Sequence, residues 1–182
     1  TTAIKWDEQP FKAKLDKIAG LKPAFKKDGT ITAGNASQIS DGAAAVVVMS
    51  SERARKTGIE PLADIVAHGM SADRYSWLHT VPALALSNAL KKAGLDVSDL
   101  DLVEINEAFA AVALNASRML ELDDERVNVN GGAVALGHPI GATGARISTT
   151  LLHEMKRRGA KRGIATLCVS GGMGMAVLFE RP

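Results

Sequence analysis

The feature that most constrains this chain is the alternation of strand-like and helix-like segments from residue 62 onward. Short apolar, β-branched runs are typical of strands, whereas apolar residues spaced three and four apart are typical of helices. The strand-like segments are 62–69, 101–105, 127–129, 163–169 and 175–179, and the helix-like segments are 82–93, 107–120 and 140–158. The order β-α-β-α-β-α-β-β predicts an α/β fold, in which helices pack on a mixed, mostly parallel sheet and the last two strands add an antiparallel edge.

The preceding residues follow a different pattern. Residues 10–19 predict a short amphipathic helix within an otherwise irregular, polar segment. The small and β-branched run at 43–49 is typical of a strand buried on both faces, and Ser50 and Gly58 are suited to begin and end a short helix after it. Because this part contains no second strand, we expect the partners of the 43–49 strand to lie in chain outside this sequence.

Composition excludes several classes of protein. The 182 residues carry 22 Lys and Arg against 20 Asp and Glu, so there is no concentrated positive field for nucleic acid or a membrane surface. The one cysteine, Cys168, rules out a disulfide framework within the chain. No apolar run is long enough to cross a membrane and no secretory signal pattern opens the sequence, so we expect a cytoplasmic location.

Two motifs in the second half of the chain contain residues suited to catalysis. Asn106 lies at a strand–helix junction, where active-site residues of α/β proteins collect, although a plain helix cap explains it as well. His138 follows a glycine-rich stretch and precedes a helix whose N-terminus would keep the imidazole neutral, as a general base requires. The segment 141–144 offers a phosphate-binding loop as an alternative, but the lysine of a Walker loop is absent.

A third motif begins at Cys168, where a strand runs into a glycine-rich turn. The backbone N–H groups of such a turn are able to bind an anion. A single cysteine on an apolar strand is more often an inert core residue, but the turn favours a thiol that points into a cleft. Cys168, His138 and Asn106 together form a thiol–imidazole–amide set of the kind used in acyl transfer, with Cys168 as the nucleophile.

These motifs resemble those of the thiolase family. The resemblance spans most of residues 23–182, in the family's order and at similar spacing. It rests on Asn-Glu-Ala-Phe-Ala at 106–110, Gly-Gly-Ala-Val-Ala-Leu-Gly-His-Pro-Ile-Gly at 131–141, Cys-x-x-Gly-Gly-Met-Gly at 168–174, and Thr-Ala-Gly-Asn-Ala-Ser at 32–37 followed by Asp-Gly-Ala-Ala-Ala at 41–45.

The resemblance implies acyl transfer to coenzyme A, either as thiolytic cleavage of a 3-ketoacyl-CoA or as Claisen condensation of acyl-CoA. Coenzyme A and acyl-CoA are then substrates, with no metal and no permanently bound cofactor. By this resemblance His138 is the base that activates a nucleophilic cysteine, and Cys168 becomes a second cysteine that acts as an acid and base. Asn106 holds a water that forms one oxyanion hole with His138, and the backbone N–H of Ser170 contributes to the other.

The same resemblance implies a set of substrate-binding residues. Ser37 contacts the pantetheine arm and Phe109 lines its channel, with Ala108 and Gly171 beside them. The sequence departs from the common family pattern at 78–82, which reads Leu-His-Thr-Val-Pro, so the motif does not indicate an acyl-chain length. Ser170 stands where many members have glycine, which a backbone donor tolerates.

The resemblance also divides the chain. Residues 1–39 correspond to the tail of the coenzyme-binding loop region, 40–58 to the last strand and helix of the N-terminal half-domain, and 59–182 to the C-terminal half-domain. An N-terminal half, on the same or a separate chain, is expected to carry the nucleophilic cysteine, and the assembly is expected to be a homo-oligomer, a dimer or a tetramer. The lack of an initiator Met agrees with a processed or excised piece.

Two alternatives remain. A β-ketoacyl synthase-like condensing enzyme shares the fold, but such enzymes commonly have a second catalytic histidine where this chain has Asn106. The chain on its own is alternatively an inactive fragment or a non-catalytic subunit, because the predicted nucleophile is absent from it.

Overall fold

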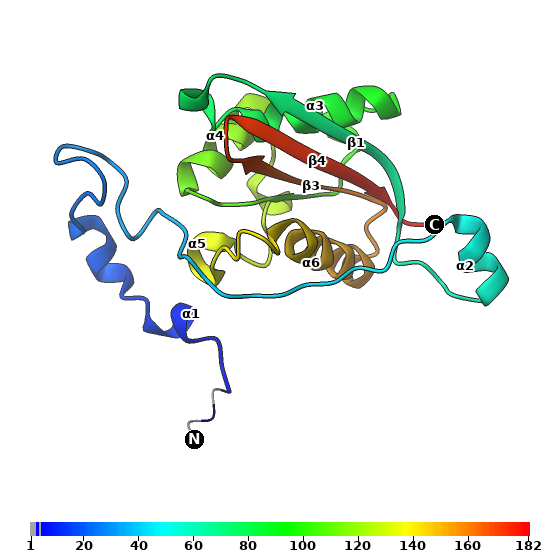
Figure 1. Ribbon diagram of the computed structural model, residues 1–182, viewed down its shortest axis with the longest axis horizontal. Helices are drawn as coiled ribbons and strands as arrows, with labels where there is room; N and C mark the ends of the chain where they lie inside the picture. Colours follow the sequence, from blue (N-terminus) through cyan, green and yellow to red (C-terminus); the bar gives the residue numbers. More distant parts are fainter. Residues whose placement is uncertain (1–2, 4) are drawn as a thin grey trace.

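The sheet is organised around the hairpin of β3 (Arg162–Val169) and β4 (Met173–Glu180) (Figure 1). The structure is a computed structural model that describes residue 3 and residues 5–182. In this part of the chain, four strands form one sheet in the order β1-β4-β3-β2, with β1 spanning Asp64–Ala72 and β2 spanning Leu102–Ile105. β4 is antiparallel to both β1 and β3, whereas β2 is parallel to β3.

The predicted mixed α/β fold is confirmed, but the expectation of a mostly parallel sheet with an antiparallel hairpin at its edge is wrong. β4 lies inside the sheet, and β2–β3 is the parallel pair within the described residues. β4 has apolar residues on both faces, with Ala176 and Leu178 on one and Val177 and Phe179 on the other. An interior position covers both faces and gives β4 a strand partner on each side.

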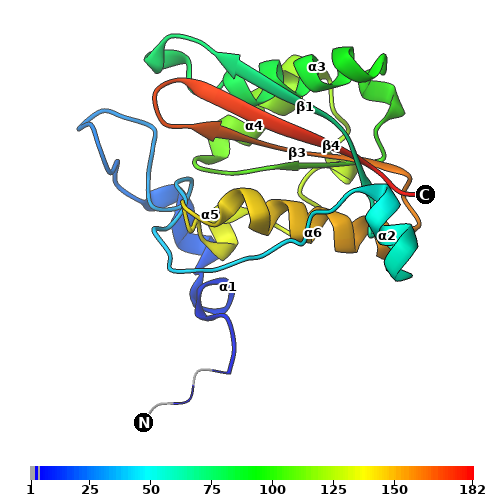
Figure 2. The ribbon, with the colours of Figure 1, turned by 45° about the vertical axis from the view of Figure 1, so that its right-hand side comes forward.

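Helices cover the two faces unequally (Figures 1 and 2). α3 (Val81–Ala93) and α4 (Ala110–Leu120) pack on one face, and α6 (Thr143–Arg158) packs against β2 and β3 on the other. The core between the sheet and the helices α3 and α4 includes Leu86, Ile105, Ile164 and Leu178. The core between the sheet and α6 includes Leu102, Ile147, Leu151, Met155 and Phe179.

Local signals set several helix ends as the sequence predicts. Ser50 Oγ accepts a hydrogen bond from the backbone N–H of Arg53 and begins α2 (Ser51–Thr57). Gly58 and Gly94 end α2 and α3 in the left-handed conformation, with φ of 68° and 67°. Of the helices that the structure describes, none is both long enough and apolar enough to cross a membrane.

Two other predicted helices begin later than expected. The segment 107–120 is helical only from Ala110, because Phe109 is extended and pairs with Ala36. The segment 140–158 is helical from Thr143, after a turn in which Ala142 donates its N–H to the carbonyl of Pro139. A further short helix, α5 (Ala133–Leu136), precedes this turn.

The first 50 residues contain two corrections. The predicted helix at 10–19 is divided into α1 (Glu8–Lys12) and a 3-10 helix (Leu15–Gly20), and Phe11 and Leu15 remain about four-fifths exposed at 79% and 77%, so no core holds the helix together. Residues 43–49 form no strand. Without a neighbouring strand their backbone groups have no ladder to join, and Val47 is 86% exposed.

The predicted strand at 127–129 is also wrong. It is reduced to a single parallel bridge between Val127 and Val103, because Asn128 adopts a left-handed conformation with φ of 47°. A strand cannot continue through that conformation. The remaining short elements are 3-10 turns at Tyr75–Trp77, Val97–Asp99 and Asp124–Arg126.

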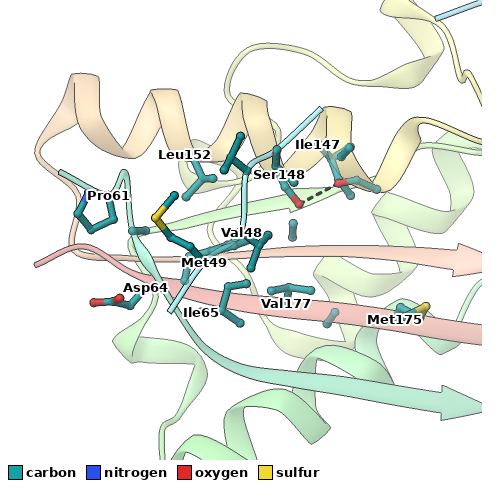
Figure 3. Close-up of a pocket in the computed structure, with 18 of the residues that line it drawn as sticks. Val48, Met49, Pro61, Asp64, Ile65, Ile147, Ser148, Leu152, Met175 and Val177 are labelled. Carbon is teal, nitrogen blue, oxygen red and sulfur yellow. Dashed lines mark hydrogen bonds between the residues drawn. The ribbon is translucent and has the colours of Figure 1, made fainter. Parts of the chain in front are cut away.

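One face of β1 and β4 is only partly covered, because α6 packs mainly against β2 and β3. The extended segment 46–50 runs along α6 and borders a cavity of about 610 Å³ (Figures 2 and 3). Its lining is mainly apolar and includes Val48, Met49, Ile65, Met175 and Val177. Ile65 and Met175 are 55% and 44% exposed, so this face carries apolar surface that nothing in the described chain covers.

The opposite face is packed so closely that it requires glycine. A Cβ on Gly69 in β1 would lie 1.9 Å from the carbonyl oxygen of Ala85 in α3, and one on Gly174 would lie 2.3 Å from that of Val81. The hydroxyls of Ser71 and Thr166 donate to the carbonyls of Val81 and Pro82 at 2.7 and 3.0 Å. These contacts fix the N-terminal end of α3 on the sheet.

We therefore expect Gly69→Ala to destabilise the chain by about 3 kcal/mol, because α3 must move away from the sheet to admit one methyl group. Gly144→Ala is the matched control. It lies inside α6, its Cβ would meet nothing closer than 3.8 Å, and alanine favours the helix. Chemical unfolding measures both free energies. Equal stabilities for the two variants would contradict the proposed close contact of α3 with β1.

Candidate active site

The carboxyl ends of the parallel strands β2 and β3 meet at one edge of the sheet and carry two of the predicted residues. Asn106 directly follows β2, and its backbone N–H donates to the carbonyl of Thr166 in β3 at 2.9 Å. Cys168 lies two residues further along β3. Side chains at the carboxyl ends of neighbouring strands are well placed to share a site.

Asn128 holds the outer edge of β2 where this site begins. Its backbone N–H donates to Val103, its Oδ1 accepts from the N–H of Ile105 at 2.7 Å, and its Nδ2 donates to the carbonyl of Ile105 at 2.9 Å. The side-chain amide thus pairs with β2 as the backbone of another strand would. The same Nδ2 donates to Glu107 Oε1 at 2.9 Å.

Glu107 connects the end of β2 to the glycine-rich segment before His138. Its Oε2 accepts the backbone N–H of Val134, at the start of α5. A Cβ on Gly132 would lie 2.1 Å from the Glu107 carboxyl carbon, so this close approach requires glycine. The two motifs are therefore in contact through a carboxylate, between residues that are 27 apart in sequence.

Asn106 and His138 form a direct pair. The Asn106 side chain is fully buried, and its Nδ2 lies 3.3 Å from Nε2 of His138. The alternative in which Asn106 caps a helix is wrong, because α4 begins four residues later with Phe109 at its N-cap. The amide instead faces the imidazole.

The hydrogen bonds around His138 determine which ring nitrogen carries the proton. The Thr143 hydroxyl donates its one hydrogen to the carbonyl of Pro139 at 2.9 Å. At 2.7 Å from His138 Nδ1 it must therefore accept, so Nδ1 carries the proton in the neutral ring. Nε2 then carries no proton, and its lone pair accepts the hydrogen bond from Asn106 Nδ2. This is the tautomer in which Nε2 can act as a base.

Two effects lower the pKa of His138 below its ordinary value. Burial is the larger one, and the positive charge of Arg146 is the second. The expected direction of the shift is confirmed, although its cause differs from the expected helix N-terminus: α6 begins five residues after His138. The imidazole is therefore neutral at pH 7 and available to take a proton.

Arg146 and Glu104 lie behind this pair. Arg146 projects from α6, with Nη2 3.5 Å from Asn106 Oδ1 and Nη1 3.9 Å from Glu104 Oε1. Glu104 is only 3% exposed on β2. Burial raises the pKa of Glu104 to about 7, and the charge of Arg146 opposes that rise.

Cys168 is nearly buried, in a small cluster with Val81 and Val112 against which Ala108 and Phe109 also pack. Burial raises the pKa of its thiol above the ordinary value. The thiol is therefore protonated at neutral pH, which is unfavourable for a nucleophile and suitable for a proton donor. Its contacts place it beside the segment that follows Asn106.

The N-terminal segment joins both motifs. Ser37 is half-buried and donates its N–H to the carbonyl of Ala108 at 3.1 Å, and Ala36 bridges to Phe109. The ring of Phe109 meets that of Phe25 edge to face at 6.1 Å. One residue further on, the carbonyl of Gln38 accepts the N–H of His138 at 2.9 Å. Residues 35–39 thus cross from one motif to the other.

The turn between β3 and β4 presents the other two predicted residues. Ser170 and Gly171 are both exposed. Gly171 and Gly172 have φ of 91° and 82°, a conformation that favours glycine. The carbonyl of Gly172 accepts the N–H of Asp73, which fixes the turn on the chain that leaves β1.

Sequence reasoning missed the residues that orient the site. These are Glu104, Glu107, Asn128, Thr143 and Arg146. A charged residue at the centre of an otherwise apolar strand signalled Glu104, and Glu107 lies within the motif at 106–110. Asn128, Thr143 and Arg146 carried no such signal. His79, in the divergent segment 78–82, is half-buried and stacks on Trp77 with the ring centroids 5.8 Å apart.

The fold and this edge define the class of protein: an α/β protein with a thiol, an imidazole and an amide at the carboxyl ends of two parallel strands. The sequence matches the family model for the C-terminal domain of thiolase over residues 59–181 and that for the N-terminal domain of thiolase over residues 1–52. The chain belongs to the thiolase family.

Individual relatives agree with this assignment. The chain is 57% identical to an acetyl-CoA acetyltransferase of Chromobacterium violaceum and 53% identical to one of Syntrophomonas wolfei, over 93% and 96% of this chain. Among solved structures it is similar to the acetyl-CoA acetyltransferase of Bacillus anthracis (TM-score 0.92, 51% identity) and to human mitochondrial 3-ketoacyl-CoA thiolase in complex with CoA (TM-score 0.87, 46% identity). These matches cover 96% and 94% of this chain.

The chain spans less than half the length of these proteins. It covers 43% and 44% of the two bacterial relatives, and 44% and 43% of the two solved structures.

We expect Asn128→Ala to destabilise the chain by about 2–4 kcal/mol, because the N–H and carbonyl of Ile105 lose their partners. Asn128→Gly removes the same amide without strain at positive φ, so it should be less destabilising by about 1 kcal/mol. Asn88→Ala is the control, since Asn88 is exposed on α3 and gives one hydrogen bond to the carbonyl of Met70. Urea unfolding measures all three. Wild-type stability in Asn128→Gly would show that the amide does not hold β2.

Proposed function

We propose that this chain supplies the base, the acid and the oxyanion-binding groups of an enzyme that transfers acyl groups to coenzyme A. The reaction is the reversible thiolytic cleavage of a 3-ketoacyl-CoA, or in reverse the Claisen condensation of acyl-CoA. The observation that carries the proposal is the Asn106–His138 pair at the end of β2, with Nε2 free to accept a proton. Similarity to enzymes named acetyl-CoA acetyltransferase supports it.

His138 acts as the general base in this proposal. Its neutral ring, with the proton on Nδ1, takes the thiol proton of the nucleophile on Nε2. Once protonated, Nε2 becomes a donor, and Asn106 Nδ2 is a second donor 3.3 Å away. Two donors at this position, directly or through an ordered water, stabilise the negative charge on a carbonyl oxygen in the transition state.

Cys168 acts as the acid and base at the reacting carbon or at the thiol of coenzyme A. Burial keeps its thiol protonated, so it is able to give a proton to a carbanion or thiolate that leaves. The backbone N–H of Ser170 in the neighbouring turn contributes to the second oxyanion hole, with Gly171 beside it. The conformation of Gly171 and Gly172 supports this role, because such turns expose successive N–H groups.

Coenzyme A binds on the side where Ser37 meets the segment after Asn106. Contacts of Ser37 and Ala36 with Ala108 and Phe109 support a shared wall for the pantetheine arm. Among the similar structures, one is described as a complex with CoA. Coenzyme A and acyl-CoA are substrates here, and the proposal includes no metal and no permanently bound cofactor.

We further propose the division into 1–39, 40–58 and 59–182, with an N-terminal half that carries the nucleophilic cysteine. The open face of β1 and β4 supports this, since Ile65 and Met175 are exposed there beside the unpaired segment 43–49 (Figure 3). A second half-domain would cover the open face and would pair with the segment 43–49. The isolated chain is then inactive. Assembly as a dimer or tetramer and a cytoplasmic location stay predictions.

The β-ketoacyl synthase-like alternative differs in its substrate. It requires an acyl carrier protein in place of coenzyme A and, commonly, a histidine at the position of Asn106. The buried amide bonded to His138 favours the thiolase reaction.

The proposal predicts that the 182-residue chain alone has no thiolytic activity, whereas a chimaera does. In the chimaera, the N-terminal part of the Chromobacterium violaceum relative precedes residues 1–182. Loss of 3-ketoacyl-CoA absorbance on addition of coenzyme A measures cleavage. Turnover by the isolated chain would contradict the proposal that the nucleophile lies on another half-domain. A folded but inactive chimaera would contradict the proposed reaction.

Within that chimaera we expect His138→Asn and Cys168→Ser each to lower kcat by about 10²–10⁴-fold, because each removes a proton-transfer group. His153→Asn is the matched control, since His153 is exposed on α6. The melting temperature of each variant separates lost chemistry from lost folding. A His138→Asn variant with wild-type kcat would remove His138 from the mechanism.

A further inference from the structure

Four hydrogen bonds in the site form one continuous series, in which each group donates to the next. Arg146 Nη2 faces Asn106 Oδ1, and Asn106 Nδ2 faces His138 Nε2. His138 Nδ1 faces the Thr143 hydroxyl, which donates to the carbonyl of Pro139. Arginine has only donors and a carbonyl has only acceptors, so both ends of this series are fixed. Every group between them has one assignment that satisfies all its neighbours.

The arginine end decides the orientation of Asn106. An amide is nearly symmetric in shape, and its oxygen and nitrogen exchange places by rotation unless neighbours distinguish them. With Arg146 on one side, Oδ1 must face the guanidinium and Nδ2 must face His138. Without a donor at that position, Oδ1 would be free to turn toward the imidazole and stabilise a proton on Nε2.

The surroundings of Arg146 are energetically unfavourable for a guanidinium group. Its Nε and Nη1 are buried and have no hydrogen-bond partner among the described residues. Its countercharge, Glu104, lies 3.9 Å from Nη1, beyond hydrogen-bond distance. A half-satisfied buried guanidinium weakens a fold, so an arginine that served packing alone would be better replaced by an apolar residue.

We propose that Arg146 is a positioning residue, which acts through Asn106 to keep Nε2 of His138 unprotonated and ready to accept a proton. Its charge acts in the same sense, because it opposes a second positive charge on His138. The charged groups nearby are Arg146 itself, from α6, and Glu104 and Glu107, which face Arg146 from β2 and the residues after it. The catalytic consequence rests on the proposed function, whereas the state of the imidazole does not.

The test measures that state directly, by ¹⁵N–¹H NMR of the histidine rings in the 182-residue chain, with His138→Gln to assign the signal. In the wild type we expect the Nδ1–H tautomer of His138. Because Arg146→Met alone would leave Glu104 buried without a countercharge, the variant used is Arg146→Met with Glu104→Gln. It should shift the titration midpoint of His138 upward and mix its tautomers. Arg146→Lys keeps the charge and one donor and should retain the wild-type tautomer.

Two controls separate positioning from general damage. Glu104→Gln alone keeps the arginine, so it should not raise the midpoint. Arg118→Gln changes an exposed arginine on α4 and should change nothing. An unchanged tautomer and midpoint in the double variant, relative to Arg118→Gln, would overturn the proposal.

Kinetics of the chimaera then test the consequence. The double variant should lower kcat by about 10²-fold through misplacement of Asn106, with KM for coenzyme A little changed. A double variant with wild-type kcat in an active chimaera would contradict the role of Arg146 in the reaction. If the wild-type chimaera is itself inactive while the NMR shifts occur as expected, the proposed function fails and the positioning of His138 by Arg146 stands.

Discussion

The site depends on how β2 is held at its outer edge, where no strand follows it in the described sheet. An edge strand of four residues has few backbone partners, and its last residues would fray if their N–H and carbonyl groups faced only solvent. Asn128 prevents this by pairing its amide with both groups of Ile105 while its Nδ2 also reaches Glu107. Because Asn106 is the next residue, the position of the proposed oxyanion donor is set by a side chain 22 residues further along the chain.

Polar contacts connect the end of β2 to α5 and α6. Glu107 ties the end of β2 to the start of α5, and Gly132 leaves the room this requires. Arg146 and Thr143, both on α6, then bracket Asn106 and His138. The long helix is anchored independently by Ile147, Leu151 and Met155 against the sheet. A rigid, well-packed element therefore carries the two groups that orient the Asn106–His138 pair.

The sequence predicted most helices and strands from residue 62 onward, because their patterns follow local rules: Gly94 at the end of α3 and the apolar run of β3 are examples. It failed where a distant contact decided the outcome. Asn128 replaces a predicted strand with a side chain, and β4 enters the centre of the sheet because both its faces are apolar. The motifs brought Asn106, His138 and Cys168 forward as site residues, whereas Thr143 and Arg146 were visible only once α6 was placed beside β2.

The two sides of α6 have different surroundings, and in the proposed function this would separate the preparation of the base from the supply of the nucleophile. On its polar side, toward Asn106 and His138, the orienting hydrogen bonds close among residues of this chain and end at the carbonyl of Pro139. On its other side, apolar surface of β1 and β4 and the unpaired segment 43–49 are left exposed. The hydrogen bonds that set the tautomer of His138 all lie on the first side, away from this exposed apolar surface. If a second half-domain docks on that surface, it therefore meets an imidazole already in the basic form, and its docking need only place a thiol near Nε2.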